Sequence, residues 1–226
     1  MSGSAPFRLA AFDLDGTLLD SASSIVAGVM TCWTACGFPL PEPDTVRRII
    51  GLPWEESVVS LLPDAGPREF AMIRNYHDEV ARGERKRHVP DQTLFSGVID
   101  LLEELDREGY LLAIITSRSS HRLHELLEKE KIADRFVSLK TTDHGPGKPS
   151  PDLMLQTLAE LGIEARDAVM VGDTTFDVLM ACNAGTAAIG VSWGVHEPHE
   201  LREAGAHHVA EAIHELPLMI GQLTAR

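Results

Sequence analysis

Two carboxylates, Asp13 and Asp15, stand one residue apart after the mainly apolar segment 7–12, and Gly16 follows them. An apolar run that ends in Asp and Gly is typical of a buried strand followed by a sharp turn. Residues i and i+2 of an extended chain point to the same side, so both carboxylates should project together from the carboxyl end of the strand. Each would raise the pKa of the other unless a cation lay between them. A bare pair of this kind is most often a solvated turn, so its meaning depends on the rest of the chain.

Three further segments carry polar groups that could complete a cation and anion site. Thr116 follows the apolar run LLAII, Lys148 lies in GPGKPSPD, and Asp173 and Asp177 lie in AVMVGDTTFD. In an open α/β sheet, ligands bind outside the carboxyl ends of the strands. We therefore expect these segments and the first pair of carboxylates to converge on one place.

Together the four segments resemble the motifs of the haloacid dehalogenase superfamily, in its magnesium-dependent phosphatase branch. DxDGTL, a hydrophobic run ending in Thr, a KPxPD lysine and GDxxxD occur in the family's order, and the resemblance covers almost the whole chain. The phosphoglycolate phosphatase-like and beta-phosphoglucomutase-like members are closest in pattern. The resemblance implies an α/β fold, with a Rossmann-like three-layer core around a parallel sheet and an inserted all-helical cap.

The resemblance also implies a role for each acidic residue and for the lysine. Asp13 would be the nucleophile that forms an aspartyl-phosphate. Asp15 would protonate the leaving group and then act as base for the attacking water. Lys148 would bridge the phosphate and Asp13. The implied cofactor is Mg²⁺, bound by Asp13, Asp15 through its backbone carbonyl, and Asp173, with Asp177 supporting the metal shell; alternatively, Asp177 is a first-turn helix acid favoured by the helix dipole.

Substrate contacts are implied at the end of one strand and in the cap. Thr116 and the amides beyond it would bind phosphate oxygens, and Ser117 stands where the family often has Asn. In related members a glycine-containing cap loop closes over the substrate, and Gly51 would permit a positive φ or a close approach there. Arg47 or Arg48, beside this loop, could pair with a substrate carboxylate. The alternative is a plain helix-turn-helix with solvated arginines.

The elements that must position these residues follow from periodicity and breakers. No strand signal occurs between residues 20 and 91, where helices are predicted over 21–36, 43–50, from Pro53 to near Pro63 and from Pro67 to the break at His88. Beyond Phe95 helices alternate with predicted strands at 110–115, 136–139, 168–171 and 187–189. Such alternation predicts a parallel sheet with right-handed crossovers. We therefore predict a catalytic core of residues 1–19 and 92–226 and a helical cap of residues 20–91.

Composition limits the classes of partner. The chain has 226 residues and a formal charge of −14, which argues against nucleic acid as a partner. An anionic substrate stays compatible, because a metal ion and one lysine can invert the local field. Three cysteines suit a reducing cytoplasm, and no apolar segment reaches the roughly 18 residues of a membrane span. We expect a cytoplasmic monomer or homodimer acting on a small phosphorylated metabolite, with its ten histidines, among them His196, in surface or packing roles.

Several alternatives can be weighed from the residues. Dehalogenase members lack an acid at the position of Asp15, and phosphonate-cleaving members also use a cap lysine, whereas the only lysine in this cap is Lys86, at its far end. A beta-phosphoglucomutase-like mutase or a sugar phosphatase stays open. In another class, a phosphorylation-sensing receiver module is much shorter and lacks the insert, and a catalytically silent phospho-binding protein usually loses the nucleophile or the lysine. The sequence therefore predicts a magnesium-dependent phosphatase, with phosphoglycolate as the first expected substrate and a sugar phosphate as the second.

Overall fold

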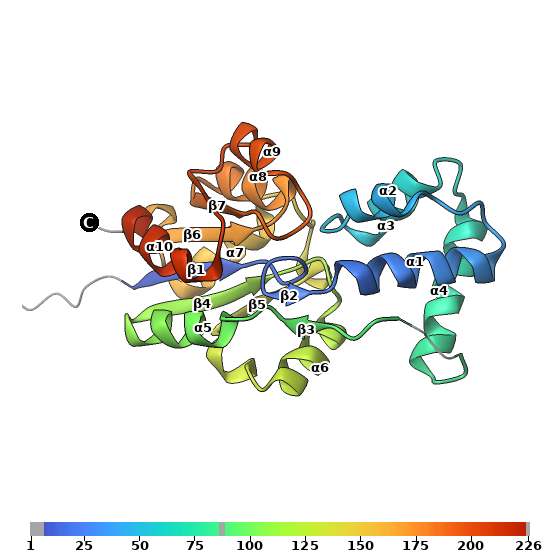
Figure 1. The fold of residues 1–226 in the computed structure, drawn as a ribbon, viewed down its shortest axis with the longest axis horizontal. Coiled ribbons are helices and arrows are strands. Elements are labelled where there is room, and N and C mark those ends of the chain that lie inside the picture. The colour runs from blue at the N-terminus through green and yellow to red at the C-terminus, as the bar shows by residue number, and fades with distance from the viewer. Residues whose placement is uncertain (1–6, 86–88, 225–226) are drawn as a thin grey trace, which may run out of the picture.

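The computed structural model describes residues 7–85 and 89–224, which form an α/β fold around a six-stranded parallel sheet. The strand order is β5-β4-β1-β6-β7-β8, so the strand that carries the first two acids lies at the centre (Figure 1). The strands are β1 (Arg8–Phe12), β4 (Tyr110–Ile115), β5 (Ser138–Lys140), β6 (Ala168–Gly172), β7 (Ala187–Val191) and β8 (His208–Ala210).

Helices cover both faces of the sheet and make the core three layers thick. One face packs against α5 (Val98–Arg107), α6 (Ser120–Glu130) and α10 (Leu216–Thr224). The other packs against α7 (Asp152–Leu161), α8 (Thr175–Ala184) and α9 (Pro198–Glu203). Successive side chains of β1 enter the two hydrophobic clusters in turn, which is why its sequence is continuously apolar.

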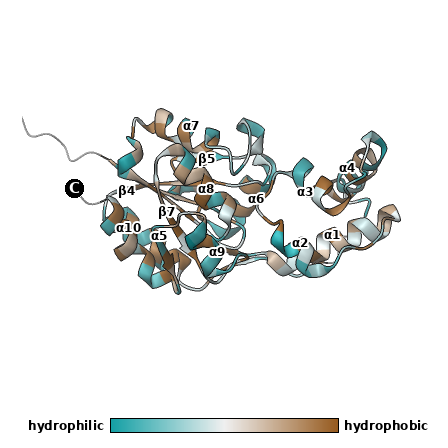
Figure 2. Cartoon of the chain, turned by 90° about the horizontal axis from the view of Figure 1, so that it is seen from above, coloured by the Kyte–Doolittle hydropathy of each residue, from teal (hydrophilic) through white to brown (hydrophobic). Residues whose placement is uncertain are grey.

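Four helices lie apart from the sheet, beyond the carboxyl end of β1 (Figures 1 and 2). They are α1 (Ala22–Cys36), α2 (Pro43–Arg48), α3 (Trp54–Leu61) and α4 (Pro67–Ala81). Their own hydrophobic core is built around Cys32, Trp33, Val58, Ile73 and Tyr76. All four helices were predicted, and the ends of α1, α2 and α3 agree to within two residues because proline and glycine mark most of them. The fourth helix was predicted to continue to His88, but α4 ends at Ala81, two residues before Gly83, which has φ +73°.

The two connections between the cap helices and the sheet run side by side. β2 (Leu19–Asp20) pairs with β3 (Thr93–Leu94) in an antiparallel ladder that places Asp20 opposite Thr93. This short ladder lies next to the predicted limits of the cap, at residues 20 and 91. The division into core and cap domains at these limits stays a prediction. Lys86 and His88 themselves lie outside the described residues. No helix in the described ranges is both long and apolar enough to cross a membrane.

Two details of the core differ from the prediction. The strand predicted at 136–139 begins only at Ser138, because the 3₁₀ turn η1 (Ala133–Arg135) directs Phe136 into the core beneath α6 before pairing with β4 starts. The last strand, β8, was not predicted individually, since three residues are too few to show a period. The remaining short turns are η2 (Thr142–His144), η3 (Ala165–Asp167) and η4 (Ile213–Glu215).

Candidate active site

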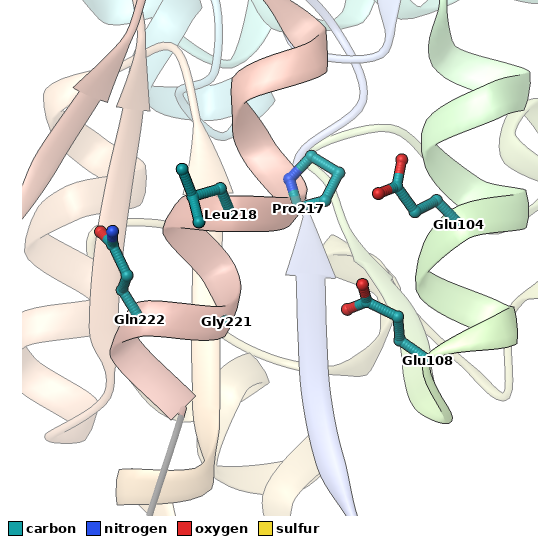
Figure 3. A pocket seen from close by; sticks show the side chains of 6 residues that line it. All are labelled: Glu104, Glu108, Pro217, Leu218, Gly221 and Gln222. Carbon is teal, nitrogen blue, oxygen red and sulfur yellow. The ribbon is translucent and has the colours of Figure 1, made fainter.

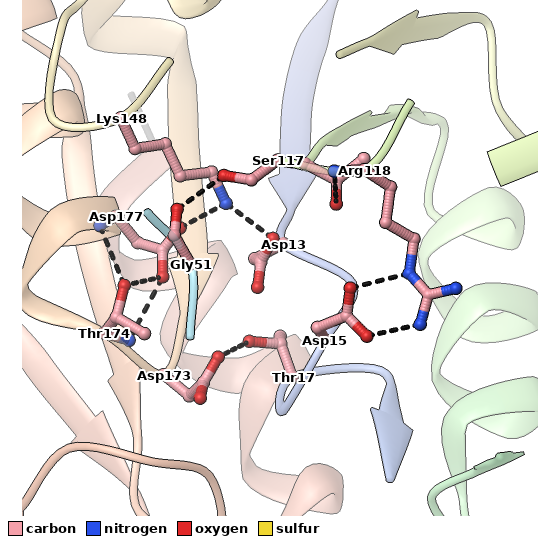
Figure 4. Close-up of polar contacts among 11 residues, drawn as sticks. Asp13, Asp15, Thr17, Gly51, Ser117, Arg118, Lys148, Asp173, Thr174 and Asp177 are labelled. Atoms are coloured by element: carbon pink, nitrogen blue, oxygen red, sulfur yellow. Dashed lines mark hydrogen bonds and ion pairs between the residues drawn. The ribbon is translucent and has the colours of Figure 1, made fainter. Parts of the chain in front are cut away.

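All four predicted segments meet at the carboxyl edge of the sheet (Figure 4). β1, β4 and β6 are neighbouring strands, and Asp13, Thr116 and Asp173 each follow one of them directly. All three residues are buried. Lys148, from the loop before α7, reaches the same place although 135 residues separate it from Asp13. The predicted convergence is therefore confirmed in space.

Lys148 is the central cation of the cluster. Its side chain is 1% exposed, with Nζ 2.5 Å from Oδ1 of Asp13 and 2.6 Å from Oδ1 of Asp177. Burial alone would lower the pKa of this lysine, but the two carboxylates outweigh that effect and raise it above its ordinary value. Lys148 therefore stays charged, because its two ion pairs offset the cost of burying the ammonium group.

Asp173 sits where only glycines allow it to fit. A Cβ on Gly16 would lie 2.2 Å from Oδ2 of Asp173, and a Cβ on Gly194 would lie 2.1 Å from its Cβ. Its carboxylate accepts hydrogen bonds from the Thr17 hydroxyl at 2.8 Å and from the Val195 amide at 3.0 Å. The loop after β7 therefore orients Asp173. Nothing in the sequence around Gly194 indicated this role.

The buried acids make a site that fits a hard divalent cation. Asp13, Asp173 and Asp177 each offer one carboxylate oxygen, and these oxygens all lie within 4.8 Å of one another. Burial raises the pKa of Asp13 to about 7 and that of Asp173 well above its ordinary value, and the negative charge of Asp177 adds to both shifts. Lys148 alone does not balance three acids, so a further cation would stabilise their ionised forms. An oxygen-only donor set suits Mg²⁺ better than Zn²⁺.

Asp177 is a first-turn helix acid, as one of the two predicted interpretations has it, and it also pairs with Lys148. Its Oδ2 accepts hydrogen bonds from the amide and hydroxyl of Thr174, at 3.1 and 2.6 Å, which closes a capping box at the start of α8. Its Oδ1 faces Lys148. The same carboxylate therefore begins the helix and fixes the lysine.

Asp15 has a partner that sequence reasoning missed. Arg118 donates from Nε and Nη2 to the two carboxylate oxygens of Asp15, at 2.6 and 2.5 Å (Figure 4). Burial would raise the pKa of Asp15, but the charge and hydrogen bonds of Arg118 lower it below its usual range. The available signal was the position of Arg118, two residues after Thr116 in the same loop. Thr116 itself accepts a hydrogen bond from the Arg118 amide at 3.3 Å.

The cap loop at Gly51 reaches the core as expected. Gly51 has φ +101°, so the predicted positive φ is confirmed, and a Cβ there would lie 3.3 Å from Thr174 and 3.4 Å from Phe176. The Ser117 hydroxyl donates to the Gly51 carbonyl, which ties the loop to the end of β4. The loop therefore lies directly over the rim of the acidic cluster.

The two cap arginines occupy different environments. Arg47 is exposed on α2. Arg48 is paired with Glu200 at the start of α9, and His196 contacts the backbone carbonyl of Arg48 through Nε2 at 3.0 Å. His196 is buried, and its Nδ1 accepts from the Thr175 amide, so this histidine joins cap to core rather than only packing. Arg48 thus holds the cap against the core in this arrangement.

A separate hollow of about 420 Å³ lies between α5 and α10 (Figure 3). It is lined by Glu104, Glu108, Pro217, Leu218, Gly221 and Gln222. Arg8, at the start of β1, donates to the Glu108 carbonyl, so this region adjoins the amino ends of the strands. The hollow therefore opens at the opposite end of the sheet from Asp13 and Lys148.

Comparisons with known proteins agree with this geometry. The probable phosphatase IndB of Dickeya dadantii is 36% identical over 211 residues, covering 92% of this chain and 91% of that protein. The phosphoglycolate phosphatase of Vibrio parahaemolyticus is 29% identical over 219 residues, covering 92% and 94%. The crystal structure of a hydrolase from Pseudomonas syringae superposes with a TM-score of 0.82 at 26% identity, covering 96% and 100%. Residues 10–191 match the sequence profile of the haloacid dehalogenase-like hydrolases, and the chain belongs to that family.

Proposed function

We propose that the protein is a magnesium-dependent phosphatase that hydrolyses a small phosphorylated metabolite through an aspartyl-phosphate on Asp13. The observation that carries this proposal is the contact of Asp13 with the buried Lys148, beside Asp173 and within reach of Asp15. A nucleophilic carboxylate, a fixed positive charge and a general acid are the groups that transfer of a phosphoryl group to a carboxylate requires.

The residues divide the reaction into two steps. In the first, an oxygen of Asp13 attacks phosphorus, the bond from phosphorus to the leaving oxygen breaks, and Asp15 gives that oxygen a proton. Because Arg118 lowers the pKa of Asp15, Asp15 must first take up this proton, and the negative charge of the bound phosphate would favour that uptake by raising the pKa again. In the second, a water oxygen attacks phosphorus, Asp15 takes the water proton, and the bond from phosphorus to Asp13 breaks. Lys148 offsets the repulsion between Asp13 and the phosphate in both steps. Mg²⁺, held by Asp13, the Asp15 carbonyl and Asp173, would supply additional charge neutralisation.

Phosphoglycolate is the first expected substrate. The Vibrio relative, named a phosphoglycolate phosphatase, aligns over nearly the full length of both chains. Phosphoglycolate is also a small, doubly anionic ester, which suits a site near a cap loop that the Ser117 hydroxyl ties to the core. Thr116 and Ser117 are proposed to bind the phosphate end, and Gly51 and Arg47 the other end.

The proposal is tested by phosphate release from a panel of phosphorylated metabolites. We expect the highest kcat/KM on phosphoglycolate, complete loss of activity in EDTA, and recovery on addition of magnesium. Full activity in the presence of chelator would contradict the metal assignment. Conversion of β-glucose 1-phosphate into glucose 6-phosphate without release of phosphate would show a mutase instead. Phosphate binding without turnover would indicate a silent binding protein.

Replacing Arg47 and replacing Arg48 should have different kinetic effects. If Arg47 contacts the substrate carboxylate, Arg47→Ala should raise KM for phosphoglycolate about tenfold and leave KM for p-nitrophenyl phosphate unchanged. Arg48 is committed to Glu200, so Arg48→Ala should change both substrates by similar, smaller factors. Steady-state kinetics of both variants on both substrates make the measurement. A loss confined to phosphoglycolate in Arg48→Ala would reverse the two assignments.

A further inference from the structure

A chain of polar side chains connects Asp15 to the cap. Beyond its two bonds to Asp15, Arg118 donates through Nη2 to Oε1 of Gln92 at 2.8 Å. Gln92 in turn donates through Nε2 to the hydroxyl of Ser24 at 2.9 Å. Ser24 is a buried residue of α1, and Gln92 lies just before β3, in the connection that returns from the cap to the sheet. Three hydrogen-bonded links therefore join a cap helix to the predicted general acid.

The geometry of this chain restrains the orientation of Asp15. The side chains of Arg118 and Asp15 are only 16% and 12% exposed, so water has little access to replace their contacts. A guanidinium group that engages both oxygens fixes the plane of a carboxylate, which a single hydrogen bond does not. Gln92 uses both ends of its amide, one toward the core and one toward the cap. The position of the guanidinium group therefore follows the position of the cap connection.

We propose that Arg118 is a positioning residue that sets the orientation of the Asp15 carboxylate, and that Gln92 and Ser24 make this orientation depend on where the cap lies. The role rests on the proposed function, in which Asp15 acts on the leaving group and on the attacking water. Arg118 acts through Asp15 and has no contact with the reacting atoms in this role. Loss of the arginine should therefore affect the catalysed steps and leave substrate affinity largely unchanged.

A double-mutant cycle with Asp15 tests this role. On p-nitrophenyl phosphate, whose good leaving group keeps Asp15 variants measurable, Arg118→Ala should lower kcat about tenfold and change KM less than twofold. On an alkyl phosphate the loss in kcat should be larger. In an Asp15→Ala background, Arg118→Ala should cause no further loss, because the group it orients is gone. A full additional tenfold loss in that background, or a tenfold rise in KM, would overturn the proposal in favour of direct substrate binding.

The link to the cap is tested with Gln92→Leu and Ser24→Ala. Each change alone should lower kcat by a few fold, a smaller loss of the same kind as in Arg118→Ala. Combined with Arg118→Ala, neither change should lower kcat further. The matched control is Arg82→Ala, which removes another arginine that donates two bonds to one carboxylate, here the exposed Glu84. This control should keep wild-type kinetics on both substrates. Unchanged kinetics in Gln92→Leu would overturn the link to the cap.

Folding and function can be separated in the same experiments. If Arg118→Ala fails to fold, Arg118→Lys supplies the measurement, since an ammonium group can engage one oxygen of Asp15 and should retain an intermediate kcat. Wild-type kinetics in Arg118→Lys would contradict a requirement for the planar guanidinium group. A wild-type protein that hydrolyses none of the phosphates would overturn the proposed function and this role with it. An active wild-type protein with additive losses would overturn only the role of Arg118.

Discussion

Asp13→Asn is expected to abolish turnover, with a loss of at least about 10⁴-fold in kcat. The amide keeps the size and shape of the carboxylate but lacks the nucleophilic oxygen that would form the aspartyl-phosphate. Phosphate release at saturating substrate gives the measurement. Beryllium fluoride, which mimics a phosphoryl group on a carboxylate, should occupy the wild-type protein at Asp13 and fail to bind the variant. Retention of a tenth of wild-type activity would contradict a covalent mechanism.

The same variant is expected to stay folded, for a reason that the pKa of Asp13 supplies. Burial raises this pKa from 3.8 to about 7, so in the metal-free protein the folded state binds this proton more tightly than the unfolded chain does. The contribution of Asp13 to the free energy of unfolding is therefore most favourable below pH 4 and declines as the pH rises to about 7. A neutral amide removes that decline. Metal-free Asp13→Asn should melt no lower than the wild type at pH 8.

Lys148→Met is expected to have the second largest effect. Methionine fills much of the same volume but carries no charge, so Asp13 and Asp177 lose the cation that lies 2.5 and 2.6 Å from them. Removing a preorganised charge from a phosphoryl-transfer site should lower kcat by about 10²- to 10³-fold. Breaking a buried ion pair from one side should also lower the free energy of unfolding by about 3 kcal/mol in metal-free protein.

Lys140→Met is the matched control for this prediction. Lys140 lies at the end of β5 and pairs with Glu160 at 2.5 Å, but Glu160 is 46% exposed. Exposed pairs contribute less than about 1 kcal/mol, so this variant should keep its kcat and nearly all of its stability. Urea unfolding and steady-state kinetics on both variants give the comparison. A kcat within threefold of wild type in Lys148→Met would remove the lysine from the proposed mechanism.

The elements of the fold were largely predictable because their signals are local. The apolar run before Asp13 shows a strand buried on both faces, and the side chains of β1 do enter two separate hydrophobic clusters. Gly37 ends α1 with φ +72°, as a glycine after a periodic apolar stretch predicts. The sequence identified the four strands of five or six residues, β1, β4, β6 and β7, and, with shifted bounds, the short edge strand β5. Strands of two or three residues, such as β2, β3 and β8, are too short to show a period.

The convergence of Asp13, Thr116 and Asp173 was also predictable, because parallel strands bring their carboxyl ends to one edge. Lys148 follows no strand, and its place beside them was expected from the resemblance of its motif to that of the family. The partners of those residues were not predictable. Arg118 lies 103 residues from Asp15, and Arg48 lies 152 residues from Glu200.

The physical reason is that the signals which define helices and strands are local in the sequence, whereas the pairing of side chains depends on contacts between distant segments. Hydrophobic period, caps and turn residues act over a few neighbours, so the sequence by itself determined the elements and the residues at their ends. Which carboxylate an arginine meets depends on loop paths and on how the cap is placed, and several acids of similar chemistry compete for it. Only the tertiary structure decided that Arg118 pairs with Asp15 and that Arg48 pairs with Glu200. It also decided that Gly194 leaves room for the side chain of Asp173.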